Sequence, residues 1–264
     1  MKQDTFFRDH WADIAPESLE DYQQMFTWRP EMAPLLASAD LEPGQVVVDY
    51  GCGPGGLALE LAGRTGPSGH VHGVDLNADF VRMARQALAG AGFAAFTTVH
   101  HVTDDRIPLG DAKADRLVCK NVMEYVPDVA ATLAEFRRVV RPGGIAHIID
   151  SDWGMLVVEP LGPTKLRELM DAASAAFRTP HIGRSLYGEM KRAGFSDVSV
   201  AIRAGADTEG RMLPVIQHVA HYAEVSGKLD QKRVDAILTE VRQSIAEGAC
   251  LMTLPQFIVT GRVT

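Results

Sequence analysis

The stretch VVDYGCGPGG, residues 47–56, places a glycine-rich turn directly after an apolar run and an acid. A turn of this kind between a buried strand and a helix points backbone N–H groups toward a ligand. The GxGxG spacing of Gly51, Gly53 and Gly55 allows positive φ and lets a ligand approach the main chain closely. A tight turn without a ligand has the same spacing, so this motif needs support from its neighbours.

A carboxylate follows one strand later, in the stretch GVDLN at residues 73–77. Asp75 falls at the carboxyl end of the second expected strand, where it can accept both hydroxyl groups of a ribose bound over the turn. The two features together predict a cofactor that contains adenosine. NAD would satisfy both, but the turn lacks the full GxGxxG spacing, and a segment of 44 residues rich in aromatic side chains precedes the first strand.

Apolar runs alternate with helical patterns from residue 45 onward, which is typical of a mostly parallel sheet covered by helices. We expect strands at 45–50, 70–75, 96–102, 115–120, 144–150, 195–203 and 256–263. We expect helices at 56–63, 77–90, 128–140, 163–178 and 183–193. The sequence therefore predicts an α/β fold.

Two segments add to this core. Residues 1–44 predict an N-terminal helical lid, although their aromatic side chains would also suit simple packing on the sheet. Residues 45–264 form the main domain, with a helical cap insertion at about 204–255 before the last strand. The apolar stripe of the insertion fits core packing, closure of a substrate pocket, or a contact in a homodimer.

Composition narrows the function. The chain has 264 residues and a formal net charge of −8, which disfavours a nucleic-acid partner because phosphate binding needs a basic face. Its three cysteines have no CxxC spacing and indicate reduced thiols. No run has membrane-spanning length and no signal peptide is evident, so we expect a cytoplasmic protein without a membrane partner. Neighbouring His100 and His101 point to opposite faces of one strand, and we expect no metal.

The order of motifs resembles the class I S-adenosylmethionine-dependent methyltransferases, in the broad group that includes quinone-biosynthesis and natural-product enzymes. The matching stretches are VVDYGCGPGG, GVDLN, TDDRIPLGDAKADRLVCKNVMEYVPD and RRVVRPGGIAHIID. The resemblance implies a Rossmann-like sheet of seven strands, mostly parallel with an antiparallel last strand and with helices on both faces. It also implies S-adenosyl-L-methionine as cofactor and S-adenosyl-L-homocysteine as product.

The resemblance also assigns cofactor-binding roles to residues around the expected turn and strand ends. They are Asp49, Gly51, Gly53 and Gly55 around the methionine moiety, Asp75 on the ribose, Leu76 on the adenine face, Asp104 or Asp105 at the adenine amino group, and Lys120 with Asn121 beneath the sulfonium. Arg29 is a further candidate, as a partner of the cofactor carboxylate. A solvated surface charge is the alternative for Arg29.

The acceptor side offers weaker signals. Asp152 and Trp153 follow the fifth strand and suit a base, or an amine anchor, beside an aromatic wall, although an N-cap with a packing indole has the same sequence. His181 lies on a loop between helices and is a candidate base, as is Tyr22 in the lid. Trp28 and Tyr125 are candidate substrate contacts. Tyr125 stands where many relatives have the histidine of a Leu-Glu-His stretch, so any role of that histidine is in doubt here.

These features predict in-line methyl transfer to a small organic acceptor, with an aromatic or heterocyclic N- or O-nucleophile favoured. C-methylation of a quinone-like ring, a non-methylating enzyme of the cyclase type, and a cofactor-binding scaffold are the alternatives. Because the methyl donor is already activated, the protein contributes mainly proximity, alignment and a dry pocket. A general base is needed only for a nucleophile that arrives protonated.

Overall fold

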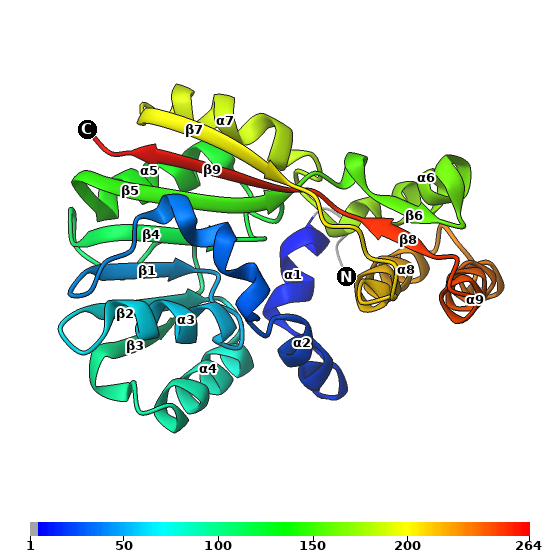
Figure 1. Cartoon of the computed structure of the whole chain (residues 1–264), viewed down its shortest axis with the longest axis horizontal. Coiled ribbons are helices and arrows are strands. Elements are labelled where there is room, and N and C mark those ends of the chain that lie inside the picture. Colours follow the sequence, from blue (N-terminus) through cyan, green and yellow to red (C-terminus); the bar gives the residue numbers. More distant parts are fainter. Residues whose placement is uncertain (1–4) are drawn as a thin grey trace.

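The computed structural model describes residues 5–264, and its core is a seven-stranded sheet (Figure 1). The strand order is β3-β2-β1-β4-β5-β9-β7. The strands are β1 (Val46–Tyr50), β2 (His70–Asp75), β3 (Thr97–His101), β4 (Ala114–Lys120), β5 (Val140–Ser151), β7 (Ser196–Arg203) and β9 (Gln256–Arg262). Strand β9 runs antiparallel to both of its neighbours, whereas β1 to β5 pair in parallel. The predicted Rossmann-like sheet with an antiparallel last strand is confirmed.

Helices cover both faces of this sheet because its central strands are apolar on both sides. Val47 of β1 packs in a cluster with α3 (Gly56–Thr65) and α4 (Ala78–Gly90). Its neighbour Val48 points the other way, into a cluster with α5 (Val129–Val139) and α7 (Ile182–Arg192). Strands buried on both faces read as continuous hydrophobic runs, and this is the pattern that the sequence shows at residues 46–48.

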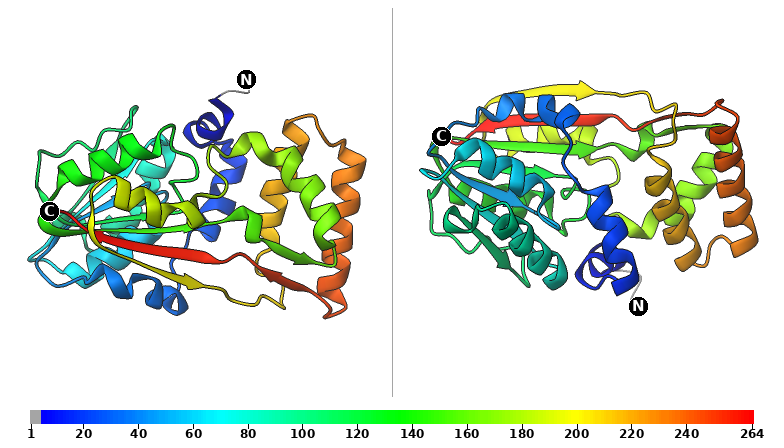
Figure 2. Two further views of the ribbon diagram at one scale, coloured as in Figure 1. Left: turned by 90° about the horizontal axis from the view of Figure 1, so that it is seen from above. Right: turned by 60° about the horizontal axis from the view of Figure 1, so that its bottom comes forward.

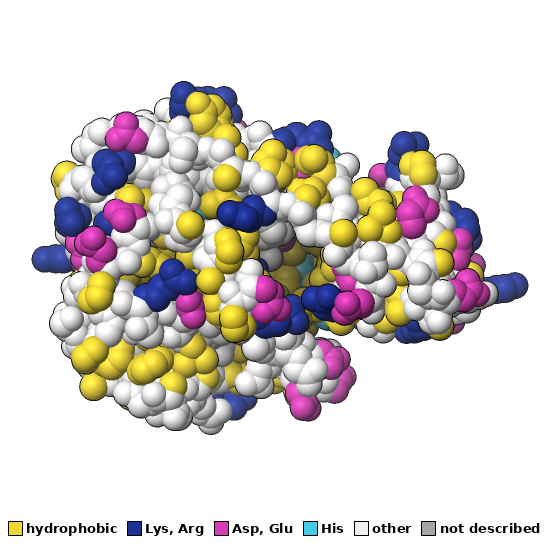
Figure 3. Space-filling view, in the orientation of Figure 1, with side chains coloured by type: hydrophobic (Ala, Val, Ile, Leu, Met, Phe, Trp, Pro, Cys, Tyr) yellow, Lys and Arg dark blue, Asp and Glu magenta, His cyan; other side chains and the backbone are white. Residues whose placement is uncertain are grey.

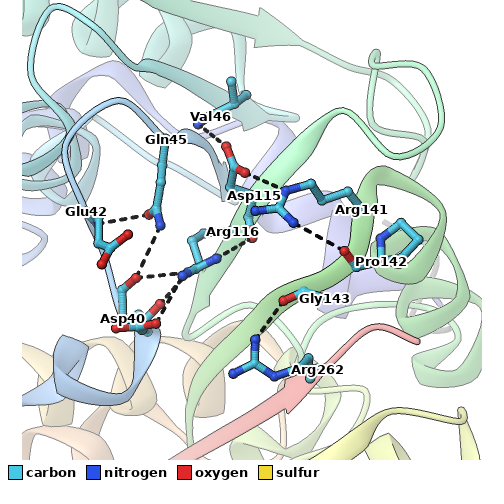
Figure 4. A network of polar contacts seen from close by, with 11 residues as sticks. Asp40, Glu42, Gln45, Val46, Asp115, Arg116, Arg141, Pro142, Gly143 and Arg262 are labelled. Atoms are coloured by element: carbon cyan, nitrogen blue, oxygen red, sulfur yellow. Dashed lines mark hydrogen bonds and ion pairs between the residues drawn. The ribbon is translucent and has the colours of Figure 1, made fainter.

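A polar network holds the amino ends of β1 and β4 together, at the end of the sheet where these parallel strands begin (Figure 4). Asp115 accepts a hydrogen bond of 2.7 Å from the Val46 N–H and one of 2.6 Å from the Arg141 guanidinium. Arg116 is buried and donates to the carbonyl oxygens of Ala39 and Asp40. The network fixes the position of β1 relative to β4. The opposite ends of these two strands carry the glycine-rich turn and Lys120.

Replacing Asp115 with alanine is expected to lower the free energy of unfolding by about 1–3 kcal/mol, because it leaves the Val46 N–H and Arg141 without their acceptor. Burial opposes ionisation, but these hydrogen bonds lower the pKa of Asp115, so the stabilisation holds above its unfolded pKa and is lost as pH falls through the folded one. Urea unfolding measures the effect. Asp79→Ala, at an exposed ion pair on α4, is the matched control and should change stability by less than about 0.5 kcal/mol.

A second hydrophobic cluster forms a helical cap beyond the sheet. It joins α6 (Gly162–Ala173), α8 (Leu213–Val225) and α9 (Gln231–Ala246) to a small sheet of β6 (Val157–Glu159) and β8 (Leu251–Thr253). The short β6 and β8 were not predicted. Residues that follow β5 thus pack together with the expected insertion at 204–255, and Phe6 from the N-terminus joins them.

The N-terminal segment lies between the carboxyl ends of the parallel strands and the cap, as both Figure 1 and Figure 2 show. It contains α1 (Phe6–Ala12), α2 (Leu19–Met25) and 3-10 helices at Pro16–Ser18 and Pro30–Ala39. Ile14 and Tyr22 pack against Phe80 of α4. Residues 1–4 of the expected lid lie outside the described residues. The described part of this segment lies over the carboxyl ends of the parallel strands and is called the lid below.

Candidate active site

A cavity of about 1160 Å³, open to solvent, lies at the carboxyl ends of β1, β2 and β4. The N-terminal segment forms its opposite wall, through Arg8, Trp11 and residues 25–28. Ten residues singled out in the sequence line it, namely Trp28, Gly51, Gly53, Asp75, Leu76, Asp104, Asp105, Lys120, Asn121 and Tyr125. In an open α/β sheet this is where ligands bind.

Within the turn, Gly53 faces the cavity and has φ of 51°, in the left-handed region that glycine favours. Its N–H donates a 2.7 Å hydrogen bond to the Asp75 carboxylate. The nearest atom to an added Cβ would be a ring carbon of Phe26, 3.7 Å away, so side-chain atoms there would enter the cavity. This glycine keeps space open for a ligand.

The next two glycines have another role. An added Cβ on Gly55 would lie 2.9 Å from the Cα of Ala84 in α4, and Gly55 does not line the cavity. The expected contact of Gly55 with a cofactor is therefore not what the structure shows: this residue lets α3 and α4 approach each other. At Gly56 an added Cβ would lie 2.2 Å from the carbonyl oxygen of Phe26. Gly56 thus leaves room for the lid backbone.

Asp75 connects the turn to the start of α4. Besides the bond from Gly53, it accepts a 2.9 Å hydrogen bond from the Asn77 N–H. Asn77 caps α4 by accepting from the Phe80 N–H, and its side chain donates to the carbonyl oxygen of Trp11 at 2.9 Å. Burial raises the pKa of Asp75. The second strand end, the glycine turn and the lid are therefore held by one short chain of hydrogen bonds.

Three further acids lie buried at the same strand ends, around Lys120. Burial, together with the nearby charge of Asp75, raises the pKa of Asp49 to about 8. Burial raises the pKa of Asp150 to about 7, although it accepts hydrogen bonds from three backbone N–H groups. Burial and the nearby charge of Asp150 also raise the pKa of Glu124 well above its ordinary value. Burial lowers the pKa of Lys120. The charges of these three carboxyl groups act on one amine, and Asp75 lies near Asp49, so the site suits a cationic ligand.

Several buried polar atoms at this site have no hydrogen-bond partner among the described residues. They include the carboxylate Oδ2 of Asp49 and the amide Oδ1 of Asn121, both hydrogen-bond acceptors, and the indole N–H groups of Trp11 and Trp28. Buried polar groups are nearly always paired in folded proteins. Asn121, Trp11 and Trp28 line the cavity, whereas the buried Asp49 does not, so these atoms fit a ligand that supplies a donor to the sheet side and an acceptor to the lid side.

The loop after β3 brings its two acids to the cavity and also anchors the lid. Asp105 forms an ion pair of 3.5 Å with Arg8 of α1, and the same guanidinium donates to the carbonyl oxygen of Thr103 at 3.3 Å. Asp104 accepts a bond from the Arg106 N–H, which shapes the loop. Arg8 was not singled out in the sequence, where one arginine between Phe7 and Asp9 carries no signal.

Aromatic rings form the wall opposite the glycine turn. Trp11, Phe26, Trp28 and Tyr125 line the cavity, and the centroids of the Trp11 and Tyr125 rings lie 5.1 Å apart. Tyr125 also stacks on Phe177 at 5.7 Å, which ties this wall to the cap. These aromatic side chains make this wall largely apolar, so it suits a ring-shaped organic molecule.

Two residues expected at the site lie beside it instead. The side chain of Arg29 is 52% exposed, lies 3.8 Å from Glu31 and does not line the cavity, although its neighbour Trp28 does. Tyr22 is buried under Phe26, with its hydroxyl 3.4 Å from that of Tyr222. Tyr22 therefore connects the lid to the cap and does not line the cavity.

The expected acceptor-side group is not brought to the cavity either. Asp152 is fully buried and caps a 3-10 helix through the Gly154 N–H, while Arg184 and His181 donate to its oxygens. Burial opposes ionisation, but these bonds from α7 and its N-cap lower the pKa of Asp152. Trp153 donates its indole N–H to Glu124 and packs on Phe177. Asp152 and Trp153 therefore match the alternative interpretation of their sequence, a helix N-cap followed by an indole that packs in the core.

Asp152→Asn is therefore expected to cost stability, by about 1–3 kcal/mol, and to leave cofactor affinity and turnover near wild-type values. The substitution removes the charge that holds Arg184 while keeping the size of the side chain. Denaturant unfolding and steady-state kinetics on the same preparation separate the two effects. A large loss of turnover at unchanged stability would contradict this prediction and indicate that Asp152 takes part in catalysis.

Comparison with known proteins agrees with this geometry. Residues 41–209 match the model of a family described as a methyltransferase domain. The chain belongs to this methyltransferase family. It is 34% identical over 115 residues, 44% of its length, to the ubiquinone/menaquinone biosynthesis C-methyltransferase UbiE of Cupriavidus metallidurans, of which the match covers 46%. The matched stretches span about half of the curated relatives' own lengths or less.

Solved structures share the fold of the methyltransferase family at low sequence identity. Phosphoethanolamine N-methyltransferase 2 of Haemonchus contortus, bound to phosphomonomethylethanolamine and S-adenosylhomocysteine, superposes with a TM-score of 0.66 at 16% identity, covering all of this chain and 61% of that one. The cyclase SpnF superposes with a TM-score of 0.55 at 18% identity, covering 88% of this chain and 80% of that one. One fold thus carries different reactions.

No helix within residues 5–264 combines the length and the apolar character needed to cross a membrane. No group of three or more His, Cys, Asp or Glu side chains in the same range is arranged to hold a metal ion.

Proposed function

We propose that the protein transfers a methyl group from S-adenosyl-L-methionine to a small organic acceptor, an aromatic or heterocyclic N- or O-nucleophile, and releases S-adenosyl-L-homocysteine. Methyltransferase family membership and the cavity at the strand ends support the reaction class. The proposal depends most on one observation: Asn121, which lines the cavity, and Asp49, which is buried at the end of the neighbouring strand β1, carry acceptor atoms without partners among the described residues.

The charge of the site distinguishes between adenosine cofactors. S-Adenosyl-L-methionine carries a sulfonium and an ammonium group, and both are stabilised near carboxylates. The negative pyrophosphate of a nicotinamide dinucleotide would gain no such stabilisation from the same buried acids and would oppose their ionisation. In the proposed arrangement Asp75 accepts from the ribose hydroxyls, Asp49 and Asn121 accept from the ammonium group, and the open space at Gly53 admits the methionine moiety.

When bound, the cofactor supplies a methyl group that is already activated on sulfur. The protein then has to align the acceptor and exclude water. Trp11, Phe26, Trp28 and Tyr125 form the wall that would hold a ring beside the methyl group. No histidine is among the residues that line the cavity within the described range, which favours an acceptor that binds already nucleophilic.

Calorimetry with S-adenosyl-L-methionine, S-adenosyl-L-homocysteine and NAD⁺ tests the cofactor. We expect micromolar or tighter binding of the first two and no binding of NAD⁺. A panel of phenols, heterocyclic amines and quinols then tests the acceptor, with one S-adenosyl-L-homocysteine formed for each methylated product. Binding of NAD⁺ with no binding of the sulfonium cofactor would refute the proposal.

C-methylation of a quinone-like ring is the second candidate, supported by the 34% identity to UbiE and by the aromatic wall of the cavity. Mass spectrometry of the product, with the position of the new methyl group found by NMR, distinguishes transfer to carbon from transfer to nitrogen or oxygen. A product without an added methyl group would instead support chemistry of the cyclase type, as the name of the neighbour SpnF suggests.

A further inference from the structure

Strand β7 is the free edge of the seven-stranded sheet, and its exposed side chains are unusual for such a place. Within residues 5–264 it pairs with β9 alone, so the backbone groups of its other side have no strand partner there along residues 196–203. Two of its apolar residues, Val200 and Ile202, are 46% and 55% exposed. Natural sheets normally protect an edge of this length with lysine, proline or a covering element, because it can pair with another strand.

The exposed apolar side chains of β7 lie on one face. Val200 and Ile202 stand opposite Val259 and Phe257 of β9, and opposite residues on neighbouring strands share a face. Figure 3 shows hydrophobic side chains at the surface near the place where Figure 1 puts the carboxyl end of β7. The helix on this face, α7, contacts the start of the strand through Val198, whereas Ser199–Arg203 stay exposed.

The sequence of β7, SDVSVAIR, complements itself when a second copy runs antiparallel to it. With Val200 of both copies on a twofold axis, Val198 stands opposite Ile202 and Ser199 opposite Ala201. Asp197 then stands opposite Arg203, twice. A twofold axis requires this kind of reciprocal pairing. Pairs of apolar residues and of opposite charges across two strands stabilise a sheet.

Both charged residues are available for this contact. The Asp197 side chain is 79% exposed, and its nearest cation is Arg262 at 3.7 Å. No hydrogen bond or ion pair within residues 5–264 involves the side chain of Arg203, which is also exposed. A register irregularity between Ser196 and Ser199, with φ of 49° at Asp197, falls at the ends of the joint ladder. At these ends the long side chain of Arg203 in one copy can still reach the Asp197 carboxylate of the other.

We propose that β7 is the dimer interface of this protein, where two copies pair edge to edge through residues 197–203 and join their sheets into one. The occupant of the edge is a second copy of this chain, because the strand matches its own reversed sequence in both charge and hydrophobicity. The interface lies on the opposite edge of the sheet from β3 and uses none of the residues that line the cavity.

Analytical ultracentrifugation of the full chain tests the interface. At micromolar protein concentrations the wild type is expected to sediment as a species with twice the 28.6 kDa mass of one chain. Val200→Lys puts two ammonium groups next to the axis and should raise the dimer dissociation constant about a hundredfold. Val225→Lys changes a valine of similar exposure, 43%, at the end of α8 and should leave the dimer intact. A single cooperative thermal unfolding transition confirms that each variant is folded.

Charge reversal fixes the register. Asp197→Arg and Arg203→Asp should each weaken the dimer about tenfold, and the double variant should restore it, because each like-charged pair becomes an opposite pair again. A Val200→Cys variant should form a disulfide-linked dimer on oxidation. The three native cysteines are buried and do not compete. A monomeric wild type at 100 μM, or a Val200→Lys variant that is still dimeric, would overturn the proposal.

Discussion

Replacing Asp75 with alanine is expected to weaken the binding of S-adenosyl-L-methionine by about 2–4 kcal/mol, or roughly 30- to 1,000-fold in Kd. The carboxylate is proposed to accept two hydrogen bonds from the ribose, and bonds to a charged acceptor contribute about 1.5–3 kcal/mol each. Isothermal titration calorimetry measures the loss. Asp79→Ala, four residues on in the exposed first turn of α4, is the matched control and should leave Kd unchanged.

Asp75 also holds the Gly53 and Asn77 N–H groups, so a lost contact has to be separated from a disturbed turn. A 2′,3′-dideoxy analogue of S-adenosyl-L-homocysteine makes this separation. The wild type should bind the analogue far more weakly than S-adenosyl-L-homocysteine, whereas the alanine variant should hardly discriminate between the two. If the variant discriminates as strongly as the wild type, Asp75 does not contact the ribose.

Binding of S-adenosyl-L-methionine is expected to become tighter as pH rises from 6 to 8, by roughly tenfold per pH unit. Burial raises the pKa of Asp49 to about 8, so this carboxyl group holds a proton in the free protein at neutral pH. A cation bound beside it favours the ionised form and lowers that pKa. At a pH between the lower pKa of Asp49 in the complex and its higher pKa in the free protein, the complex carries fewer protons than the free protein and free cofactor together. Affinity for the cofactor therefore rises with pH in this range.

Calorimetry in buffers of different ionisation enthalpy should detect close to one proton released per cofactor bound at pH 7. Asp150 titrates in the same range, with a pKa of about 7, so a variant is needed to assign the proton. Asp49→Asn should weaken binding and abolish most of the pH dependence. A Kd that stays constant between pH 6 and 8, or an Asn variant that keeps the full dependence, would contradict the role of Asp49.

The sheet and its ligand-binding end were predictable because their signals are local. Continuous apolar runs identify strands that are buried on both faces, and glycines at fixed spacing identify the turn that follows the first of them. The carboxyl ends of parallel strands meet at one edge, which predicted Asp75 beside the turn, and the family resemblance added Asp104, Asp105 and Lys120 at the same place.

The errors in the site have a different origin, because they depend on contacts between distant residues. The sequence around Asp152 does not show that Arg184, 32 positions later, donates to its carboxylate from α7. The cap was placed at 204–255 by its helical pattern, yet its apolar cluster also includes Trp153, Leu169 and Phe6. Likewise β6 and β8 are three residues each, too short to leave an alternating pattern.

The contact at Gly56 explains why the glycine-rich turn has a glycine at this position. The carbonyl oxygen of Phe26 fills the place where a side chain would start, so residue 56 is restricted by the chain segment lying on it and not by a small molecule. A homologue that lacks a comparable N-terminal segment would tolerate alanine or serine at the corresponding position. A fourth glycine in the turn is therefore a marker of a covered cofactor site, and its replacement in a shortened homologue does not imply lost cofactor binding.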